Sequence, residues 1–238
     1  MTVPGQTALD TFSFKLVFLN PQPPKHDPDP MPRLVADNLG KRFGRRVLFR
    51  KLSFELEGGR TLAVTGANGT GKSTLLKILA GVLRPTKGAV ALHRNSQVLT
   101  REEHPLRTGL VAPYLNVYDG FSARENLAFL TQARRLPNAA ERIETVLEQV
   151  DLTTRAADLV GTYSSGMKQR VKYAAALLAE PSLLLLDEPT ANLDAAGLAM
   201  VERVMAYQRQ AGRLLVIATN VPGEAEKCDT VICVEDFR

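Results

Sequence analysis

The chain has 238 residues, of which 45% are hydrophobic and 23% are charged. This composition excludes a disordered or fibrous protein, and the length fits one large domain or two small ones. The net charge of +5 permits a nucleic-acid or membrane-surface partner without requiring one. Two cysteines, Cys228 and Cys233, are too few for a disulfide framework, and we expect both to be free thiols.

Proline is concentrated at the beginning of the chain. Seven of the 14 prolines lie in residues 1–32, where no periodicity is sustained, and this pattern predicts an extended or disordered leader. Met31 opens a stretch typical of a domain start, so translation from Met31 is an alternative explanation of the leader. The predicted folded domain covers residues 33–238.

Strand-like and helix-like segments alternate along this domain. The predicted elements are, in chain order, strands at 34–39 and 52–56 on either side of a basic turn at 40–46, a strand at 61–65, a helix at 73–80, a helix capped by Asn138 and Glu141 with its apolar face at Ile143, Val146, Leu147 and Val150, a helix at 167–179, and strands at 183–186 and 214–218. The last two strands are continuous apolar runs, which predicts burial on both faces within a parallel sheet covered by helices. The predicted fold class is α/β.

A membrane span is not expected from the sequence. The best apolar candidate, Val171–Leu186, is interrupted by charged residues and by Pro181. A helix that crosses a bilayer needs about 20 mainly apolar residues. We therefore expect a cytoplasmic chain without a span of its own.

A glycine-rich loop between the predicted strand at 61–65 and the helix at 73–80 fits the pattern G-x-x-x-x-G-K-[ST]. The glycines allow the loop to turn its backbone N–H groups toward phosphate oxygens, and the following helix adds its positive amino end. We expect Lys72 to reach the β- and γ-phosphates and the Ser73 hydroxyl to bind Mg²⁺. The predicted phosphate-binding residues are Gly66, Ala67, Asn68, Gly69, Thr70, Gly71, Lys72, Ser73 and Thr74.

Two adjacent carboxylates, Asp187 and Glu188, follow the buried strand at 183–186. The carboxyl ends of strands form the edge at which open α/β sheets bind ligands. We expect Asp187 to hold Mg²⁺ through water and Glu188 to polarise the water that attacks the γ-phosphate. An acidic pair of this kind is weak evidence alone, and the preceding phosphate loop makes it strong.

A second candidate anion site precedes the helix at 167–179. Ser164, Ser165 and Gly166 stand where a helix begins, and hydroxyl groups and a glycine suit such an end. Read locally, one serine is only a helix cap. A single chain has no need of two nucleotide sites unless one of them serves a neighbouring subunit.

Together these motifs resemble the nucleotide-binding domain of an ABC (ATP-binding cassette) transporter, over about residues 33–238. The resemblance implies a P-loop NTPase fold with a RecA-like core, a small antiparallel β subdomain and a helical subdomain at about 113–165. It places Phe43 against adenine, matches Arg124–Leu127 to the opening of the helical subdomain, and matches Ala191–Asp194 to the segment that links the two sites of a dimer.

The resemblance also implies partners. Two cassettes would pack head to tail, with ATP and Mg²⁺ between one P-loop and the Ser164–Gly166 segment of the other copy. Separate integral membrane subunits, coupled through residues 113–127, would convert closure of the pair into substrate movement. The chain would then be peripheral on the inner face of the cell membrane, and nucleic acid is not expected as a partner.

The short chain without a fused span resembles the small cassettes that energise exporters, and among these the haem exporter ATPase of cytochrome c maturation is the favoured subfamily. Polysaccharide exporters, which also use a Y-S-S-G-M type signature, stay open as an alternative. Two other readings stay open. One is a cassette that binds ATP with impaired hydrolysis and serves as a regulatory or structural partner. The other is a soluble ABC ATPase that acts on DNA or ribosomes through the basic cluster Lys41–Arg46.

Two positions depart from the family pattern. The loop 110–118 lacks the glutamine that usually approaches Mg²⁺, and Asn116 is its only carboxamide. Asn220 stands where a histidine usually contacts the γ-phosphate. Its amide can donate a hydrogen bond but cannot exchange a proton near neutral pH.

We therefore expect retained ATP binding and hydrolysis slower than that of a histidine-bearing homologue. Asn220→His should raise the ATPase rate at saturating ATP, because an imidazole can both hydrogen-bond to phosphate and exchange a proton. Steady-state phosphate release from the two proteins tests this. An unchanged rate would show that residue 220 does not occupy the histidine position.

Overall fold

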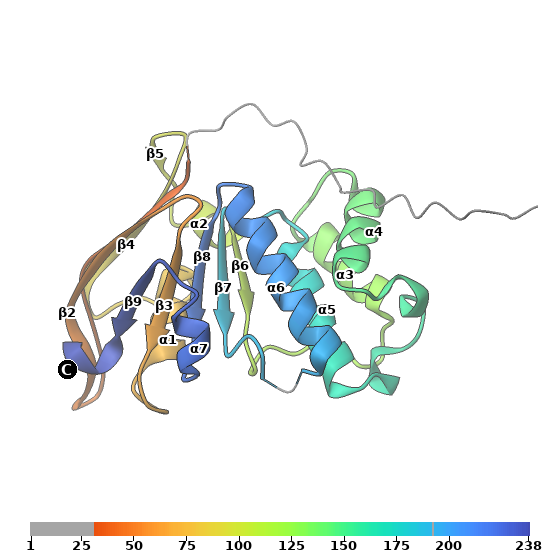
Figure 1. The fold of residues 1–238 in the computed structure, drawn as a ribbon. Coiled ribbons are helices and arrows are strands. Elements are labelled where there is room, and N and C mark those ends of the chain that lie inside the picture. The colour runs from red at the N-terminus through yellow and green to blue at the C-terminus, as the bar shows by residue number, and fades with distance from the viewer. Residues whose placement is uncertain (1–30, 192) are drawn as a thin grey trace, which may run out of the picture.

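The computed structural model describes residues 31–191 and 193–238, so all but the last two residues of the predicted leader lie outside it. An antiparallel sheet and a parallel sheet lie side by side, and most helices cover the far face of the parallel sheet (Figure 1). The α/β class predicted from the sequence is confirmed.

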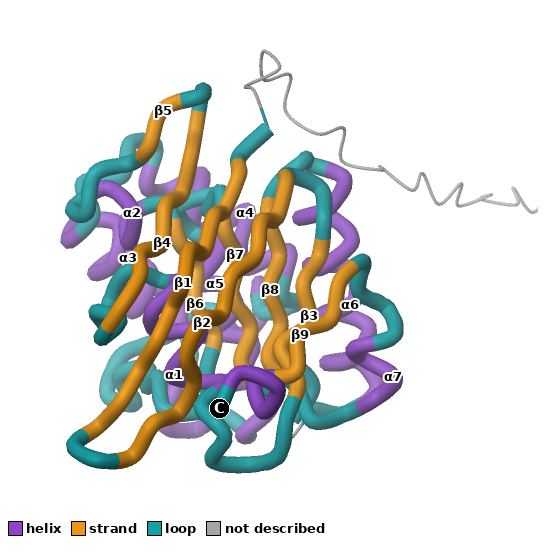
Figure 2. The backbone as a smooth tube through the Cα atoms, turned by 90° about the vertical axis from the view of Figure 1, so that its left-hand side faces the viewer, coloured by secondary structure: helices purple, strands orange, loops and turns teal. Residues whose placement is uncertain are grey.

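The antiparallel sheet has the order β2-β1-β4-β5 (Figure 2). Its strands are β1 (Arg33–Phe43), β2 (Arg46–Glu57), β4 (Lys87–Arg94) and β5 (Gln97–Val98). The predicted turn at 40–46 is wrong, because β1 and β2 continue through most of it and Phe43 pairs with Arg46. Only Gly44 and Arg45 turn, and Gly44 has a φ of +56° that suits glycine. The basic side chains are exposed, so their charge does not oppose strand pairing.

The parallel sheet has the order β6-β7-β8-β3-β9. Its strands are β3 (Thr61–Thr65), β6 (Thr108–Val111), β7 (Leu183–Asp187), β8 (Leu214–Ala218) and β9 (Thr230–Cys233). Every residue of β7 and β8 is buried, which confirms that these apolar runs lie between two covering layers. All five strands end at one edge, and the loops after β3, β6, β7 and β8 therefore meet there.

The helices fill two separate cores. They are α1 (Lys72–Leu79), α2 (Glu103–Leu106), α3 (Ala123–Ala133), α4 (Ala139–Gln149), α5 (Ser165–Leu177), α6 (Ala195–Gln210) and α7 (Pro222–Ala225), with short 3₁₀ turns η1 (Thr153–Arg155), η2 (Val160–Thr162) and η3 (Val234–Phe237). The α1 helix packs between the two sheets, while α3 to α6 pack on the other face of the parallel sheet. The α1 and α5 helices lie within two residues of their predicted bounds.

Helix capping differs from the prediction. Asn138 precedes α4, but its backbone is left-handed (φ +53°) and its side chain makes no cap hydrogen bond, so the predicted capping is wrong. The predicted apolar face of α4 is buried as expected. A complete capping box lies instead at α3, where Ser122 and Glu125 each accept a hydrogen bond from the other's backbone N–H. This cap fixes the start of the Arg124–Leu127 motif.

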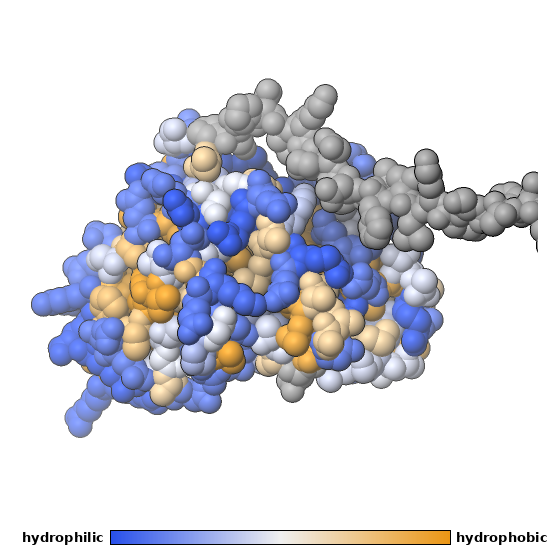
Figure 3. All heavy atoms as spheres, viewed as in Figure 1, coloured by the Kyte–Doolittle hydropathy of each residue, from blue (hydrophilic) through white to orange (hydrophobic). Residues whose placement is uncertain are grey.

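The surface seen in Figure 3 is mostly hydrophilic, with apolar residues in small separate patches. Within the described part of the chain, no helix is both long and apolar enough to cross a membrane. Cys228 and Cys233 are free thiols, as expected.

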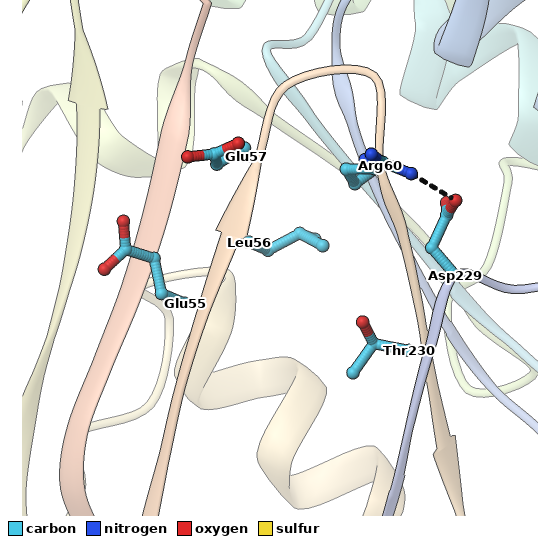
Figure 4. A pocket seen from close by; sticks show the side chains of 6 residues that line it. All are labelled: Glu55, Leu56, Glu57, Arg60, Asp229 and Thr230. Atoms are coloured by element: carbon cyan, nitrogen blue, oxygen red, sulfur yellow. Dashed lines mark hydrogen bonds and ion pairs between the residues drawn. The ribbon is translucent and has the colours of Figure 1, made fainter.

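Asp229 joins the amino end of β3 to the start of β9. Its carboxylate accepts hydrogen bonds from the Thr61 hydroxyl (2.7 Å), the Thr61 N–H (2.8 Å) and Arg60 (3.0 Å). The hydrogen bond from the Thr61 side chain is the largest of several causes that lower the pKa of Asp229 to about 2. A cleft of about 410 Å³ lies here, at the end of β3 opposite the glycine loop (Figure 4).

Replacing this carboxylate should destabilise the fold. We expect Asp229→Asn to lower the free energy of unfolding at pH 7 by about 2 kcal/mol, because charge-assisted hydrogen bonds are lost. The pKa is depressed on folding, so the contribution of the carboxylate is complete above pH 3.8 and is lost as the pH falls through about 2. Urea denaturation at several pH values should show the difference from wild type shrinking below pH 4.

The control is Glu202→Gln, which removes one partner of an exposed ion pair with Lys227. Such pairs contribute little to stability, so this variant should unfold like the wild type. Identical urea midpoints for Asp229→Asn and wild type at pH 7 would contradict the role given to Asp229.

Candidate functional site

The glycine loop joins β3 to α1 at the carboxyl edge of the parallel sheet. Gly66, Gly69 and Gly71 have φ values of +134°, +78° and +119°, which side chains with a Cβ rarely adopt. A Cβ at Gly71 would also approach the side chain of Leu48 to 3.3 Å. The three glycines therefore allow both the sharp curvature of the loop and its close packing on the antiparallel sheet.

Lys72 begins α1 and is 5% exposed. Its ammonium donates hydrogen bonds to the carbonyl oxygens of Gly66 (2.7 Å) and Ala67 (3.2 Å). An ammonium has three N–H donors, so one remains for an anionic ligand. No side chain caps the amino end of α1, and no acidic residue lies in its first turn. The loop therefore presents a cation and a positive helix end together.

Asp187 ends β7, next to this loop in space. The Ser73 hydroxyl hydrogen-bonds to its carboxyl group, while Oδ2 is buried without a partner among the described residues. Burial raises the pKa of Asp187, and the adjacent Glu188 adds to the rise. The Ser73 hydrogen bond and the positive charges of Lys72 and Lys77 oppose it. The site thus contains a desolvated carboxylate with an unused oxygen.

These residues fit a magnesium ion. No cluster of three or more His, Cys, Asp or Glu capable of holding a metal occurs in residues 31–191 and 193–238. Mg²⁺ with a nucleotide does not need one, since it usually takes one or two protein ligands together with phosphate oxygens and water. The unpartnered Oδ2 of Asp187 and the hydroxyl of Ser73 supply oxygen ligands of the right kind.

Glu188 is half-buried and follows Asp187 with a left-handed backbone (φ +52°). Its N–H donates to the carbonyl of Ala218 at 2.8 Å, which ties the end of β7 to the end of β8. Eight other described non-glycine residues also have a positive φ, so the role of Glu188 rests on its place beside Asp187 and not on its backbone.

Asn220 lies close to the start of the glycine loop. A pocket of about 480 Å³ is lined from the loop side by Thr65, Gly66 and Ala67 and from the other side by residues 219–222, Ala225, Glu226 and Val231. The structure therefore brings the Asn220 segment together with the phosphate loop, although the two are about 150 residues apart in sequence.

Phe43 lies at the tip of the β1–β2 hairpin and is 53% exposed. The Lys41 ammonium is 4.8 Å from the centre of its ring. Arg46, which pairs with Phe43 across the hairpin, donates a hydrogen bond to the Gly69 carbonyl at 2.9 Å. The hairpin tip thus borders the glycine loop and carries an exposed aromatic ring.

Ser164, Ser165 and Gly166 are not brought to the glycine loop. Ser164 caps α5, where its hydroxyl oxygen accepts the N–H of Met167 at 3.2 Å, so the local interpretation of Ser164 is confirmed. Both serines are exposed, and no hydrogen bond among the described residues links them to the loop. In the Ala191–Asp194 segment, Asn192 lies outside the described residues and Asp194 caps α6.

The structure adds residues that the sequence did not indicate. Glu235 in η3 accepts a hydrogen bond from the Ala67 N–H at 2.8 Å, across 168 positions of sequence. Tyr114 lies in the loop after β6, with its ring centre 3.9 Å from the Lys77 ammonium. Burial, and to a lesser degree the charge of Asp187, raises the pKa of Tyr114 to about 12. Asn116, the residue suggested by the sequence, is exposed.

Comparison with known proteins agrees with this geometry. A family model described as ABC transporter matches residues 49–191. The chain is 32% identical to the uncharacterized ABC transporter ATP-binding protein YdbJ of Bacillus subtilis, over 86% of this chain and 67% of that protein. It is 36% identical to the cytochrome c biogenesis ATP-binding export protein CcmA of Paramagnetospirillum magneticum, over 80% and 91% of the two chains.

A solved structure of an ATP-binding subunit of an ABC transporter superposes with a TM-score of 0.74 at 26% identity, covering 84% of this chain and 85% of that one. The chain spans only about two thirds of the length of several relatives that it matches.

A glycine loop between a buried parallel strand and a helix, with an acidic residue at the end of another strand of the same sheet, defines the class of P-loop nucleotide-binding proteins. Within that class, the chain belongs to the ABC transporter family, as an ATP-binding subunit. The resemblance drawn from the sequence motifs is confirmed. Members of this family bind ATP, typically with Mg²⁺.

Proposed function

We propose that this chain hydrolyses ATP to drive export of a substrate through separate membrane subunits. The observation that carries the proposal is the arrangement at the sheet edge. Asp187, Ser73 and Lys72 lie together, and Glu188 is the next residue along the chain. A cassette that only binds nucleotide needs the first three groups, while the glutamate supplies a base for hydrolysis.

Each of these groups has a distinct role in the proposed reaction. The loop N–H groups and Lys72 hold the phosphates, and Ser73 and Asp187 hold Mg²⁺. When bound, Mg²⁺ neutralises charge on the phosphate oxygens. Glu188 orients and polarises the attacking water, and Asn220 donates a hydrogen bond to the γ-phosphate from the opposite wall. Phe43 stacks on adenine at the hairpin tip.

The nucleotide site is completed by a second cassette. Ser164 and Ser165 are exposed and Gly166 is half-buried at the start of α5, and no hydrogen bond among the described residues links them to the glycine loop of their own chain. We place them against the nucleotide of a neighbouring cassette, identical or related. The Ser164 oxygen accepts one cap hydrogen bond, so its O–H donor stays available for a phosphate oxygen.

The membrane subunits dock on the helical region, near the loop after β6. Three aromatic side chains there are exposed, and the Tyr118 ring contacts Phe121 in a tilted geometry (5.6 Å between centroids) and Phe129 edge-on (5.8 Å). Clustered exposed aromatic residues mark protein interfaces. Docking at this surface would put the cassette at the cytoplasmic face of a membrane.

Among exporters, we propose haem export in cytochrome c biogenesis. The similarity to the export protein CcmA covers 91% of that protein, whereas the similarity to the Nod factor export ATP-binding protein I of Burkholderia orbicola, at 35% identity, covers 67%. The similarity extends over nearly all of CcmA, which is the reason for the choice.

Affinity purification of the tagged chain from native membranes tests the transporter assignment. We expect integral membrane proteins as stoichiometric partners, because exposed aromatic clusters such as Tyr118, Phe121 and Phe129 are typical of protein interfaces. Recovery of ribosomes or DNA in their place would favour a soluble ABC ATPase. Arg46 of the basic cluster donates a hydrogen bond to the Gly69 carbonyl, which supports a role for it at the rim of the nucleotide site.

The role of Glu188 separates hydrolysis from binding alone. We expect Glu188→Gln to lower the ATPase rate by at least about 100-fold while ATP affinity is retained, because an amide cannot act as a general base. Phosphate release measures the rate, and equilibrium binding measures the affinity. The matched control is Glu202→Gln, on an exposed α6 carboxylate paired with Lys227 and outside the site, which should keep the wild-type rate.

A wild type that binds ATP without detectable turnover would instead support the regulatory cassette suggested by Asn220 and by the missing glutamine. Equal rates for Glu188→Gln and wild type would remove Glu188 from the mechanism.

A further inference from the structure

Tyr114 lies in the loop after β6, beside Asp187, which is a proposed magnesium ligand. Strands β6 and β7 are parallel neighbours, with Val111 opposite Leu186, so the residues after Val111 leave the sheet next to Asp187. The Tyr114 side chain is close enough to Asp187 to feel its charge. Its hydroxyl has no hydrogen bond within the described part of the chain, and the residue is 40% exposed.

A lysine holds the tyrosine ring in this place. Ser73 and Lys77 are four residues apart on α1 and therefore lie on the same face of the helix. Ser73 contacts Asp187, and one turn later the Lys77 ammonium lies 3.9 Å from the centre of the Tyr114 ring. A cation at this distance attracts the face of an aromatic ring. The face of α1 that contacts Asp187 thus also orients Tyr114.

We propose that Tyr114 is a nucleotide-binding residue whose hydroxyl hydrogen-bonds to the Mg²⁺–triphosphate unit, and that Lys77 is a positioning residue for its ring. A phenol donates and accepts hydrogen bonds without adding negative charge beside Asp187 and Glu188. Tyr114 takes this place rather than Asn116, because the Tyr114 ring contacts Lys77 on the face of α1 that also carries Ser73. The inference rests on the proposed function, because it takes the glycine loop and Asp187 as the Mg·ATP site.

Tyr114→Phe tests the hydroxyl, because phenylalanine keeps an aromatic ring over Lys77 and removes only the O–H group. The probe is a non-hydrolysable ATP analogue, titrated calorimetrically into the full chain with Mg²⁺ and again with EDTA. We expect the variant to weaken binding about tenfold with Mg²⁺ and to leave binding in EDTA unchanged, since a hydrogen bond to a charged group is lost.

The matched control is Tyr207→Phe. Tyr207 lies on α6, and its ring also faces a cation, the Arg213 guanidinium at 5.8 Å. Removing the Tyr207 hydroxyl should change the affinity for the ATP analogue neither with Mg²⁺ nor with EDTA. A Tyr114→Phe variant that binds the Mg²⁺ complex like wild type, or that loses affinity equally with and without Mg²⁺, would overturn the role of the hydroxyl.

Lys77 supplies the second test. Lys77→Arg keeps a cation over the ring and should retain wild-type affinity, whereas Lys77→Met should reproduce the Mg²⁺-specific loss of Tyr114→Phe. Wild-type affinity in Lys77→Met would remove the positioning role. A wild type that binds no nucleotide would overturn the proposed function itself, while normal wild-type binding with an unaffected Tyr114→Phe would overturn only the present inference.

Discussion

The buried carboxylate of Asp187 is the constraint on which the rest of the site depends. The apolar strands around β7 remove this group from water, and burial raises its pKa. A desolvated carboxylate must be compensated by hydrogen bonds or by positive charge. The α1 helix supplies both, through Ser73 and through the lysines at each end of the helix. The Asp187 Oδ2 atom remains without a hydrogen-bond partner among the described residues, so it is available as a ligand for a cation.

The glycine loop keeps its shape through contacts with its surroundings. Three of its glycines have positive φ values, and glycine is conformationally free, so the loop depends on hydrogen bonds from neighbouring segments. Arg46 of the antiparallel sheet binds the Gly69 carbonyl from one side, and Glu235 binds the Ala67 N–H from the other. The antiparallel sheet and the last 3₁₀ turn therefore both support the glycine loop, from segments distant in sequence.

Under the proposed function, the site is completed by a second chain. The serines at the start of α5 have the chemistry of an anion site, yet no hydrogen bond among the described residues links them to their own chain's glycine loop. A nucleotide shared by two copies would resolve this, because each copy would then provide the half that the other lacks. Binding would link the two cassettes most tightly when ATP is present. Such coupling is what the movement of attached membrane subunits requires.

The sequence alone determined the α/β class, the strands β3, β7 and β8, the helix α1 and the glycine loop. These features depend on local patterns, namely continuous apolar runs and glycines at fixed spacing, which act over a few residues. Local patterns failed at the turn predicted for residues 40–46 and at the Asn138 cap. Pairing between strands decided the first, and a left-handed backbone decided the second.

Only the tertiary structure placed Tyr114, Lys77, Arg46 and Glu235 around the site. Their contacts join segments between 23 and 168 residues apart, and sequence periodicity does not indicate which strands are neighbours in a sheet. The parallel order β6-β7-β8-β3 brings the ends of distant strands to one edge, and this order determines which residues meet at the site.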